Sequence, residues 1–391
     1  MSGAVHPLYA AMGTTVFDAM SALARDLGAI NLGQGYPEGE DPPELIEAAV
    51  RGLRERSNQY PPMFGIAELR DAVCGFYARR QGLALAREQV VVTSGATEAI
   101  AACMLGLVSP GDEVILFQPA YDAYAPMIRR AGGVPVAVML RPPDWSYLRD
   151  EIEAAITPRT TMLVLNDPHN PVGKAASSDE LAMLAEICVA HDLTALCDEV
   201  WEEVRFDDIA HCSLMSFPGM AERTVKIGSA GKIFGLTGWK TGWFCADTAL
   251  AGPLARVHQF LTYTTPPHLQ WALAEGLTYS DDWFAARDAA WTAARARLNR
   301  GLEQGGYVVL PNAATWFLCV DLAASGIALT DREFAERAIR EAGVAAIPIS
   351  ALGEGEVPTH IVRFCFTKEA AVLEEAIERL ATFRATLSDR P

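Results

Sequence analysis

The middle of the chain alternates short apolar runs with longer segments whose apolar positions follow a helical period. Val90–Val92 is typical of a buried strand, and the segment from Ala96 to about Val108 is typical of a helix that ends before Pro110. Strands that alternate with helices indicate crossover connections and a mostly parallel sheet covered on both faces. The same pattern predicts strands at Val114–Phe117, Thr161–Asn166, Leu193–Cys197, Thr224–Gly228 and Thr241–Ala246, and helices at Tyr124–Ala131 and Asp179–His191.

The last third of the chain has a different pattern. A long Ala- and Arg-rich helix is expected at about Asp282–Glu303, and strands and helices are interspersed after it. This arrangement suggests a separate, smaller α+β domain, whereas the Pro- and Gly-rich segment Gly33–Pro43 is typical of a loop. The expected strands are Tyr307–Leu310, Trp316–Asp321, Ala345–Ile349 and Ile361–Phe366, and the helices are Asp331–Ala342 and Lys368–Ala385.

Composition and charge narrow the class of protein. The 391 residues are half hydrophobic and carry 32 basic against 49 acidic side chains, a net charge of −17, which disfavours nucleic acid and anionic membranes as partners. No apolar run approaches the roughly 20 residues of a membrane span, and no signal peptide is visible. Eight cysteines without a CxxC pair indicate reduced thiols and a cytoplasmic protein. The histidines show no metal-ligand spacing, so no metal site is expected.

The common nucleotide-binding motifs are absent. Gly33-Gln34-Gly35 lacks the third glycine of a dinucleotide turn. The run from Gly228 to Lys232 lacks the leading glycine and the Ser or Thr of a phosphate-binding P-loop. Neither NAD nor ATP is supported as a ligand.

Polar residues instead gather at the carboxyl ends of the predicted strands, where open α/β sheets bind ligands. Ser94–Glu98 opens a helix directly after a strand, which suits an anion but also an ordinary capped helix start. Asn166–Gly173 forms a rigid turn. Asp198 comes at the end of a predicted buried strand, where a carboxylate is costly unless it meets a cation. An N-cap or an internal salt bridge would also explain it.

Two basic residues complete the set. Lys232 lies among small and apolar neighbours, which suits an amine nucleophile, although most lysines simply reach the surface. Arg363 in the apolar strand Val362–Phe366 suits a bidentate carboxylate, or a buried structural pair. Each segment has an ordinary explanation when taken alone, but five independent coincidences do not explain their conjunction.

In this order and spacing the segments resemble the fold-type-I, pyridoxal-phosphate-dependent class I/II aminotransferases. The likeness is greatest to the branch of kynurenine/glutamine, methionine and succinyl-diaminopimelate aminotransferases. It covers nearly the whole chain, from Ile30–Pro37 and Asn58–Pro62 to Val362–Phe366. The implied fold is α/β, a large domain with a mostly parallel mixed sheet flanked by helices plus a smaller α+β domain. The implied bounds are 1–45 for an N-terminal arm and part of the small domain, 46–280 for the large cofactor-binding domain and 281–391 for the small C-terminal domain.

The resemblance also assigns roles to residues. Lys232 would form the Schiff base with the cofactor aldehyde and shuttle the proton between Cα and C4′. Asp198 would pair with the pyridinium nitrogen and keep it protonated. The remaining cofactor contacts would be Asn170 at O3′, Tyr121 stacked on the ring, and Gly95, Ala96, Thr97, Ser229 and Lys240 at the phosphate. The substrate α-carboxylate would meet Arg363, with Asn170, Gly35 and Tyr36 nearby. Tyr60 would reach the phosphate of a neighbouring subunit, which implies a homodimer with shared active sites.

The chain departs from the family pattern around this site. Trp201 stands where the family usually has a tyrosine that donates to O3′, and Trp316 stands near the substrate arginine where tyrosine is more common. Gln118 and Ala120 replace a usual Glu and Phe before the stacking ring Tyr121. Variation within a broad family and a redirected reaction both explain these changes.

The resemblance implies an aminotransferase that moves the amino group of an L-amino acid to a 2-oxo acid. The surroundings of Arg363 are apolar and aromatic, with no second obvious arginine for a side-chain carboxylate, which favours a neutral or aromatic amino acid. The alternative is a γ-elimination, substitution or cyclising enzyme on the same scaffold, using a substrate such as S-adenosylmethionine. A transcription regulator with an aminotransferase-like domain is disfavoured, because no basic DNA-binding segment precedes Leu32–Gly35 and the chain is acidic.

Overall fold

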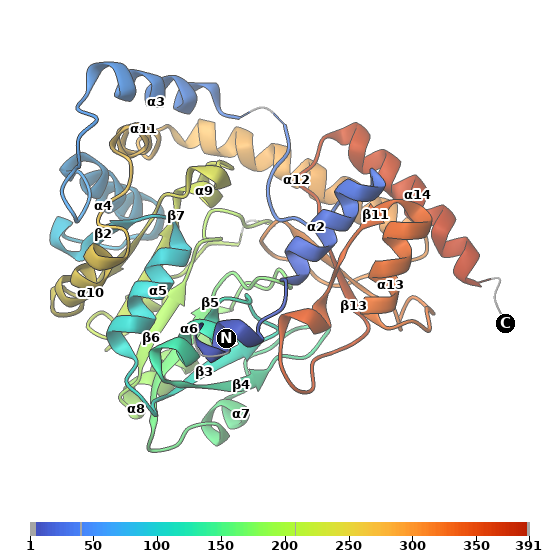
Figure 1. The fold of residues 1–391 in the computed structure, drawn as a ribbon, viewed down its shortest axis with the longest axis horizontal. Helices are drawn as coiled ribbons and strands as arrows, with labels where there is room; N and C mark the ends of the chain where they lie inside the picture. Colours follow the sequence, from blue (N-terminus) through green and yellow to red (C-terminus); the bar gives the residue numbers. More distant parts are fainter. Residues whose placement is uncertain (1–4, 40, 208, 389–391) are drawn as a thin grey trace.

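A seven-stranded sheet forms the centre of the larger part of the molecule. The computed structural model describes residues 5–39, 41–207 and 209–388 (Figure 1). The strand order is β2-β8-β7-β6-β5-β3-β4, and all neighbours pair in parallel except β8, which is antiparallel to β2 and β7. The strands are β2 (Val90–Thr93), β3 (Glu113–Gln118), β4 (Val134–Met139), β5 (Thr160–Asn166), β6 (Thr194–Asp198), β7 (Thr224–Ser229) and β8 (Gly242–Ala246). The mostly parallel, mixed sheet is therefore confirmed, and β4 is a strand that the sequence pattern did not predict.

The helices of this part cover the sheet, and its strands β3, β7 and β8 are therefore buried along their whole length. The capping box of Ser177 and Glu180 begins one helix, and Gly132 in the left-handed region ends another. The helices are α3 (Pro43–Glu55), α4 (Ala67–Gln81), α5 (Ala96–Leu107), α6 (Tyr124–Ala131), α7 (Arg149–Ala154), α8 (Ser178–Ala190), α9 (Ala230–Ile233), α10 (Thr248–Leu261) and α11 (Pro267–Gly276), with short 3₁₀ turns η1 (Arg87–Gln89), η2 (Leu214–Ser216) and η3 (Thr237–Trp239). None of the helices in the described ranges is long and apolar enough to cross a membrane.

The C-terminal part contains a four-stranded antiparallel sheet of order β12-β13-β10-β9, on the right of Figure 1. Its elements are α12 (Asp281–Gln304), β9 (Val308–Val309), β10 (Phe317–Asp321), α13 (Asp331–Arg337), the π-helical turn η4 (Ala338–Ala342), β11 (Val344–Ala345), β12 (Ile347–Pro348), η5 (Ile349–Leu352), β13 (Ile361–Cys365) and α14 (Ala370–Ser388). The single strand predicted at Ala345–Ile349 is wrong, because β11 and β12 pair with different partners. The predicted helix Asp331–Ala342 is α-helical only as far as Arg337.

Most of the N-terminal segment joins this C-terminal part, and its first helix contacts α6 of the larger part. It consists of α1 (Pro7–Ala11), α2 (Val16–Leu27) and β1 (Ile30–Asn31), and β1 pairs in parallel with β11. The Thr15 side chain caps the start of α2, and Gly28 ends the helix with a φ of 60°. After β1 the chain crosses to α3 through the loop predicted from its Pro and Gly content. The bounds 1–45, 46–280 and 281–391 stay a prediction.

Candidate active site

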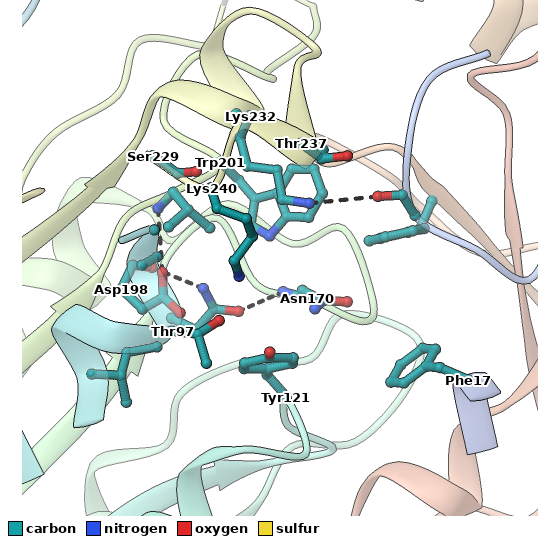
Figure 2. A pocket seen from close by; sticks show the side chains of 18 of the residues that line it. Phe17, Thr97, Tyr121, Asn170, Asp198, Trp201, Ser229, Lys232, Thr237 and Lys240 are labelled. Atoms are coloured by element: carbon teal, nitrogen blue, oxygen red, sulfur yellow. Dashed lines mark hydrogen bonds between the residues drawn. The ribbon is translucent and has the colours of Figure 1, made fainter. Parts of the chain in front are cut away.

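A cavity of about 330 Å³ lies at the carboxyl ends of β5, β6 and β7, beside the start of α5. This is the place where open α/β sheets bind their ligands. Figure 2 shows Lys232 and Tyr121 on opposite sides of it. The predicted site residues that line it are Gly35, Gly95, Ala96, Thr97, Tyr121, Asn170, Asp198, Trp201, Ser229, Lys232, Lys240 and Arg363. Twelve of the residues selected from the sequence, although distant along the chain, therefore line one cavity.

Three predicted site residues do not line the cavity. Tyr36 packs its ring against the ammonium of Lys368, with 4.5 Å between Nζ and the ring centre. Trp316 is fully buried behind Lys232. Tyr60 is 82% exposed and meets Tyr263 edge to face. Their roles toward a ligand stay predictions.

Lys232 lies in α9, directly after β7, and points into the cavity. Its Nζ atom is 3.5 Å from the carbonyl oxygen of Gly35, to which it donates (Figure 2). Burial lowers the pKa of Lys232 to about 8, since a charged amine is costly away from water. An amine with this pKa is partly neutral near physiological pH and can therefore act as a nucleophile or a base.

Asp198 ends β6 with its carboxylate inside the protein. The hydroxyl of Tyr124 donates to it at 2.5 Å, and the backbone N–H of Val200 approaches it at 3.4 Å. Burial raises the pKa of Asp198 to about 6, although the Tyr124 hydrogen bond and the charge of Lys232 act in the opposite direction. The site thus holds a carboxylate that gains stability from any cationic group placed against it.

Replacing this carboxylate is expected to stabilise the chain in the absence of ligands. The pKa of Asp198 is about 6 in the folded chain against an ordinary value of 3.8, so keeping it charged costs free energy above about pH 6. Asp198→Asn should raise the free energy of unfolding by about 1–3 kcal/mol at neutral pH, and this gain should fade as the pH drops from 6 toward 4. Urea unfolding of the ligand-free wild type and of Asp198→Asn across this pH range measures the difference in the free energy of unfolding. Tyr124→Phe is a control that keeps the carboxylate. A gain that is independent of pH would contradict the explanation.

The start of α5 forms an anion-binding end of the cavity. Gly95 precedes the helix with a φ of 80°, and the N–H groups of the first helical turn have no partner within the helix. The Nζ atom of Lys240 lies 3.5 Å from the point that a Cβ on Gly95 would occupy. On the neighbouring strand β8, a Cβ at Gly242 would come within 2.9 Å of the nitrogen of Ala96. The glycines, the helix start and the cation together make a cradle for a phosphate group.

Arg363 provides a buried cation at the other end. Its Nη1 donates to Oδ1 of Asn170 and its Nη2 to the carbonyl oxygen of Gly33, both at 2.9 Å. The guanidinium lies 3.8 Å from the ring centre of Phe317, and Nε has no hydrogen-bond partner in the described part of the chain. Burial lowers the pKa of Arg363 to about 10, which still leaves it charged. Among the described residues Asp122 is the carboxylate that interacts with this guanidinium electrostatically, and the two form no ion pair in direct contact. Arg363 therefore still offers its charge to an incoming anion.

Sequence reasoning missed several residues that build the cavity. Asn166 donates from Nδ2 to the carbonyl oxygen of Asp198 at 2.8 Å and accepts from the N–H of Asn170 at 2.8 Å, which ties two predicted residues together. Tyr124 begins α6, three residues after Tyr121, and no local pattern shows that its hydroxyl reaches Asp198. No local signal marks Phe17, which reaches the cavity from α2 and lies 5.1 Å from the Arg363 guanidinium.

A buried ionic network supports the turn that carries Asp198 and Trp201. Lys226 in β7 bridges Glu199 and Glu202 and is fully buried with both. His211 also contacts Glu199, so three groups able to bind a metal lie close together, but the Lys226 ammonium already supplies their positive charge. Burial alone would raise the pKa of Glu199, yet Lys226 and His211 outweigh it and hold that pKa at about 2. Breaking one member would leave a buried charge unpaired, so the network fixes the turn.

Comparisons with known proteins agree with this site. Residues 28–380 match the family model for aminotransferase class I and II. A protein of Mycobacterium tuberculosis named as a probable N-succinyldiaminopimelate aminotransferase is 43% identical over 97% of each chain. The solved structure of N-succinyldiaminopimelate aminotransferase from that organism is also 43% identical. It superposes with a TM-score of 0.94 and covers 97% of this chain and 100% of its own. The methionine aminotransferase of Escherichia coli is 37% identical over 94% of this chain and 96% of its own. The kynurenine–oxoglutarate transaminase 3 of mouse is 34% identical over 97% of this chain and 89% of its own. These relatives lend no support to the elimination or cyclising alternative, and on the strength of site, fold and family model together the chain belongs to the class I and II aminotransferases.

Proposed function

We propose that this aminotransferase uses pyridoxal 5′-phosphate and transfers the amino group of a neutral or aromatic L-amino acid to a 2-oxo acid. The observation that carries the proposal is the content of one cavity. It holds an amine with a lowered pKa, a buried carboxylate, an anion cradle and a buried arginine whose Nε has no hydrogen-bond partner among the described residues.

The donor set fits this cofactor group by group. The phosphate would be held by Gly95, Ala96 and Thr97 with Ser229 and Lys240, at the start of α5. Asp198 would face the ring nitrogen, Asn170 and Trp201 the phenolic oxygen, Tyr121 the ring face, and Lys232 the aldehyde carbon. When bound, the cofactor supplies a ring that accepts the electrons left at Cα after a proton is removed.

The side chains of this chain would do the remaining work. Arg363 binds the α-carboxylate through its free donor edge and so orients the amino acid with its Cα toward Lys232. The neutral amine of Lys232 takes the Cα proton, holds it as an ammonium and releases the same proton on the cofactor side. Asp198 keeps a positive charge at the ring nitrogen stable in the buried site. The second half of the cycle runs these steps in reverse with a 2-oxo acid.

The charges around the cavity support a substrate without a second carboxylate. Of the cations that line it in the described chain, Lys240 would meet the phosphate, Lys232 the aldehyde and Arg363 the α-carboxylate, which leaves none for a further acidic group. Apart from Asn170 and the nearby Asp122 carboxylate, the side chains near Arg363 are the apolar rings of Phe17 and Phe317. This argues for a donor like that of the methionine or kynurenine relatives over a substrate with a distal carboxylate.

A single-turnover assay tests the proposal. Holoenzyme is mixed with a panel of L-amino acids without an acceptor, and both the cofactor and the products are identified by mass spectrometry. We expect pyridoxamine phosphate and one equivalent of oxo acid, formed fastest from methionine or aromatic donors and more slowly from aspartate or N-succinyl-diaminopimelate. S-Adenosylmethionine is included as a control, because cofactor recovered unchanged beside an altered product would identify elimination or ring formation instead. Fastest turnover of an acidic donor would overturn the substrate assignment.

We further propose a homodimer with shared active sites, in the cytoplasm. Three large aromatic side chains, Tyr60, Phe260 and Tyr263, are exposed, two of them by more than four-fifths, which is a large apolar area for a lone chain. The segment bearing Tyr60 also connects to the α5 end of the cavity, because His258 contacts both Glu98 of α5 and the carbonyl oxygen of Met63. All eight cysteines are free thiols, as expected in a reducing compartment.

A charge placed at this aromatic surface should disrupt the dimer. In Phe260→Glu the carboxylate would be buried against the second subunit, so sedimentation should show a species near 42 kDa and weaker cofactor retention. Val308→Glu, at an exposed apolar residue in the C-terminal part, is the matched control and should sediment like the wild type. A wild-type chain that sediments as a monomer would contradict the proposal.

A further inference from the structure

Two tryptophan rings face the amine of Lys232. Its Nζ atom lies 4.6 Å from the ring centre of Trp201 and 5.0 Å from that of Trp316. The two rings meet edge to face with their centres 4.9 Å apart, and both side chains are buried. A cation over the face of an indole is stabilised by the negative potential of the ring, most strongly where water is excluded. The pair is therefore a surface suited to an ammonium ion.

Hydrogen bonding does not explain the indole of Trp316. Its Nε1–H is buried and has no hydrogen-bond partner within the described ranges. A buried donor without a partner costs stability, and a phenylalanine ring would fill much of the same space without that cost. An indole face, however, binds a cation better than the ring of Phe or Tyr does. Compared with phenylalanine, tryptophan at position 316 therefore lowers the stability of the fold but binds a cation more strongly.

The other charges around Lys232 act in opposite directions on its ammonium form, so the indole rings can add to its stabilisation. The titratable groups that face it are Asp198 at the end of β6, Arg363 and Cys365 on β13, and Lys240 after η3. Arg363 and Lys240 oppose an ammonium at Lys232, as does burial, while Asp198 and Cys365 favour it. The indole faces add stabilisation without adding a negative charge that would compete for the two neighbouring cations.

We propose that Trp201 and Trp316 are positioning residues that stabilise the ammonium form of Lys232 while it carries the Cα proton. The role in the reaction rests on the proposed function. In that step the neutral amine gains the proton from Cα, becomes an ammonium between the two rings and then gives the same proton up, so that its charge returns to zero. The tryptophan at 201 thus supplies a π face that favours the protonated lysine.

The test measures the amine directly, in the full chain without its cofactor. Trace acetic anhydride labels only neutral amines, so labelling of Lys232, quantified by mass spectrometry, is followed through a pH series on both sides of its pKa of about 8. Trp201→Leu and Trp316→Leu each remove one π face and should move the midpoint of labelling to lower pH, by about one pH unit. Trp201→Phe keeps an aromatic face and should give a smaller change in the same direction. Because no turnover is needed, failure of the aminotransferase proposal would not affect this result.

Trp291→Leu is the matched control. Its ring packs on Trp316 at 5.4 Å but faces the guanidinium of Arg287 rather than Lys232, so its loss disturbs the same cluster without removing a π face from the amine. Labelling of Lys240 in the same digests reports any general opening of the cavity. The proposal is overturned if both Leu variants label Lys232 with the wild-type pH dependence, or if Trp291→Leu moves the midpoint as far as they do. If a leucine variant fails to fold, Trp201→Phe provides the test, and its midpoint of Lys232 labelling must then lie at lower pH than that of the wild type.

Discussion

Lys232→Ala should abolish transamination, with a fall in the single-turnover rate by about 10⁴-fold or more. The amine of Lys232 is the group in the cavity that combines a lowered pKa, near 8, with a position between the predicted cofactor and substrate contacts. Its removal takes away both the nucleophile for the aldehyde and the base for the Cα proton. The measurement is the formation of oxo acid from a donor amino acid in one turnover, followed by mass spectrometry.

Lys232→Arg serves as the control for this result. Arginine keeps the positive charge and much of the volume but stays protonated, so it can neither attack an aldehyde nor take a proton. Both variants should keep the thermal unfolding of the ligand-free wild type within a few degrees, since the described residues give Lys232 one long hydrogen bond, of 3.5 Å, to Gly35, and burial of its charge offsets its contacts with the two indole rings. Retention of turnover in either variant would show that another residue carries the chemistry.

Arg363→Met should lower kcat/KM for the amino-acid donor by about 10²–10³-fold. The guanidinium is buried over Phe317 and binds Asn170 and Gly33, while its Nε has no hydrogen-bond partner among the described residues. Methionine fills the apolar space but gives no charge and no donor. Arg363→Lys should give an intermediate loss, because an ammonium lacks the planar fork that matches a carboxylate.

A substrate without the carboxylate separates binding from structure. The wild type should strongly prefer the amino acid over the corresponding primary amine, and Arg363→Met should lose most of that preference by reacting poorly with both. If the variant loses the same factor toward both compounds, Arg363 acts on the architecture of the site rather than on the carboxylate. Circular dichroism of each variant checks that the fold is retained.

The large sheet was predictable because most of its strands contain a short, mainly apolar run, although β7 includes the buried Lys226. Residues such as Asn166, Asp198 and Ser229 interrupt the pattern where their strands end, and parallel strands bring those ends to one edge. A polar residue at that point is visible in sequence without any knowledge of tertiary contacts. For this reason most of the cavity lining could be predicted.

The parts that could not be predicted depend on contacts between distant elements. Phe17 is one apolar residue of an amphipathic helix, and nothing in α2 shows that it faces Arg363. Trp316 directly precedes β10, and only the folded chain brings its ring within 5.0 Å of the Lys232 Nζ atom. The split of β11 from β12 at Ala346 depends on two partner strands that only the folded chain brings close.

The wide sequence separation of the bonds around Arg363 has a consequence for synthesis of the protein. The bond from Arg363 to Gly33 spans 330 residues, and the one to Asn170 spans 193. A ribosome has therefore added 330 residues after Gly33 before the substrate cation exists, and a nascent chain that already contains Lys232 still lacks Arg363. Closing such long loops is slow, so this site is completed late and only in the finished polypeptide. A chain that stops before β13 thus contains Lys232 but lacks the guanidinium that would select an amino acid for it.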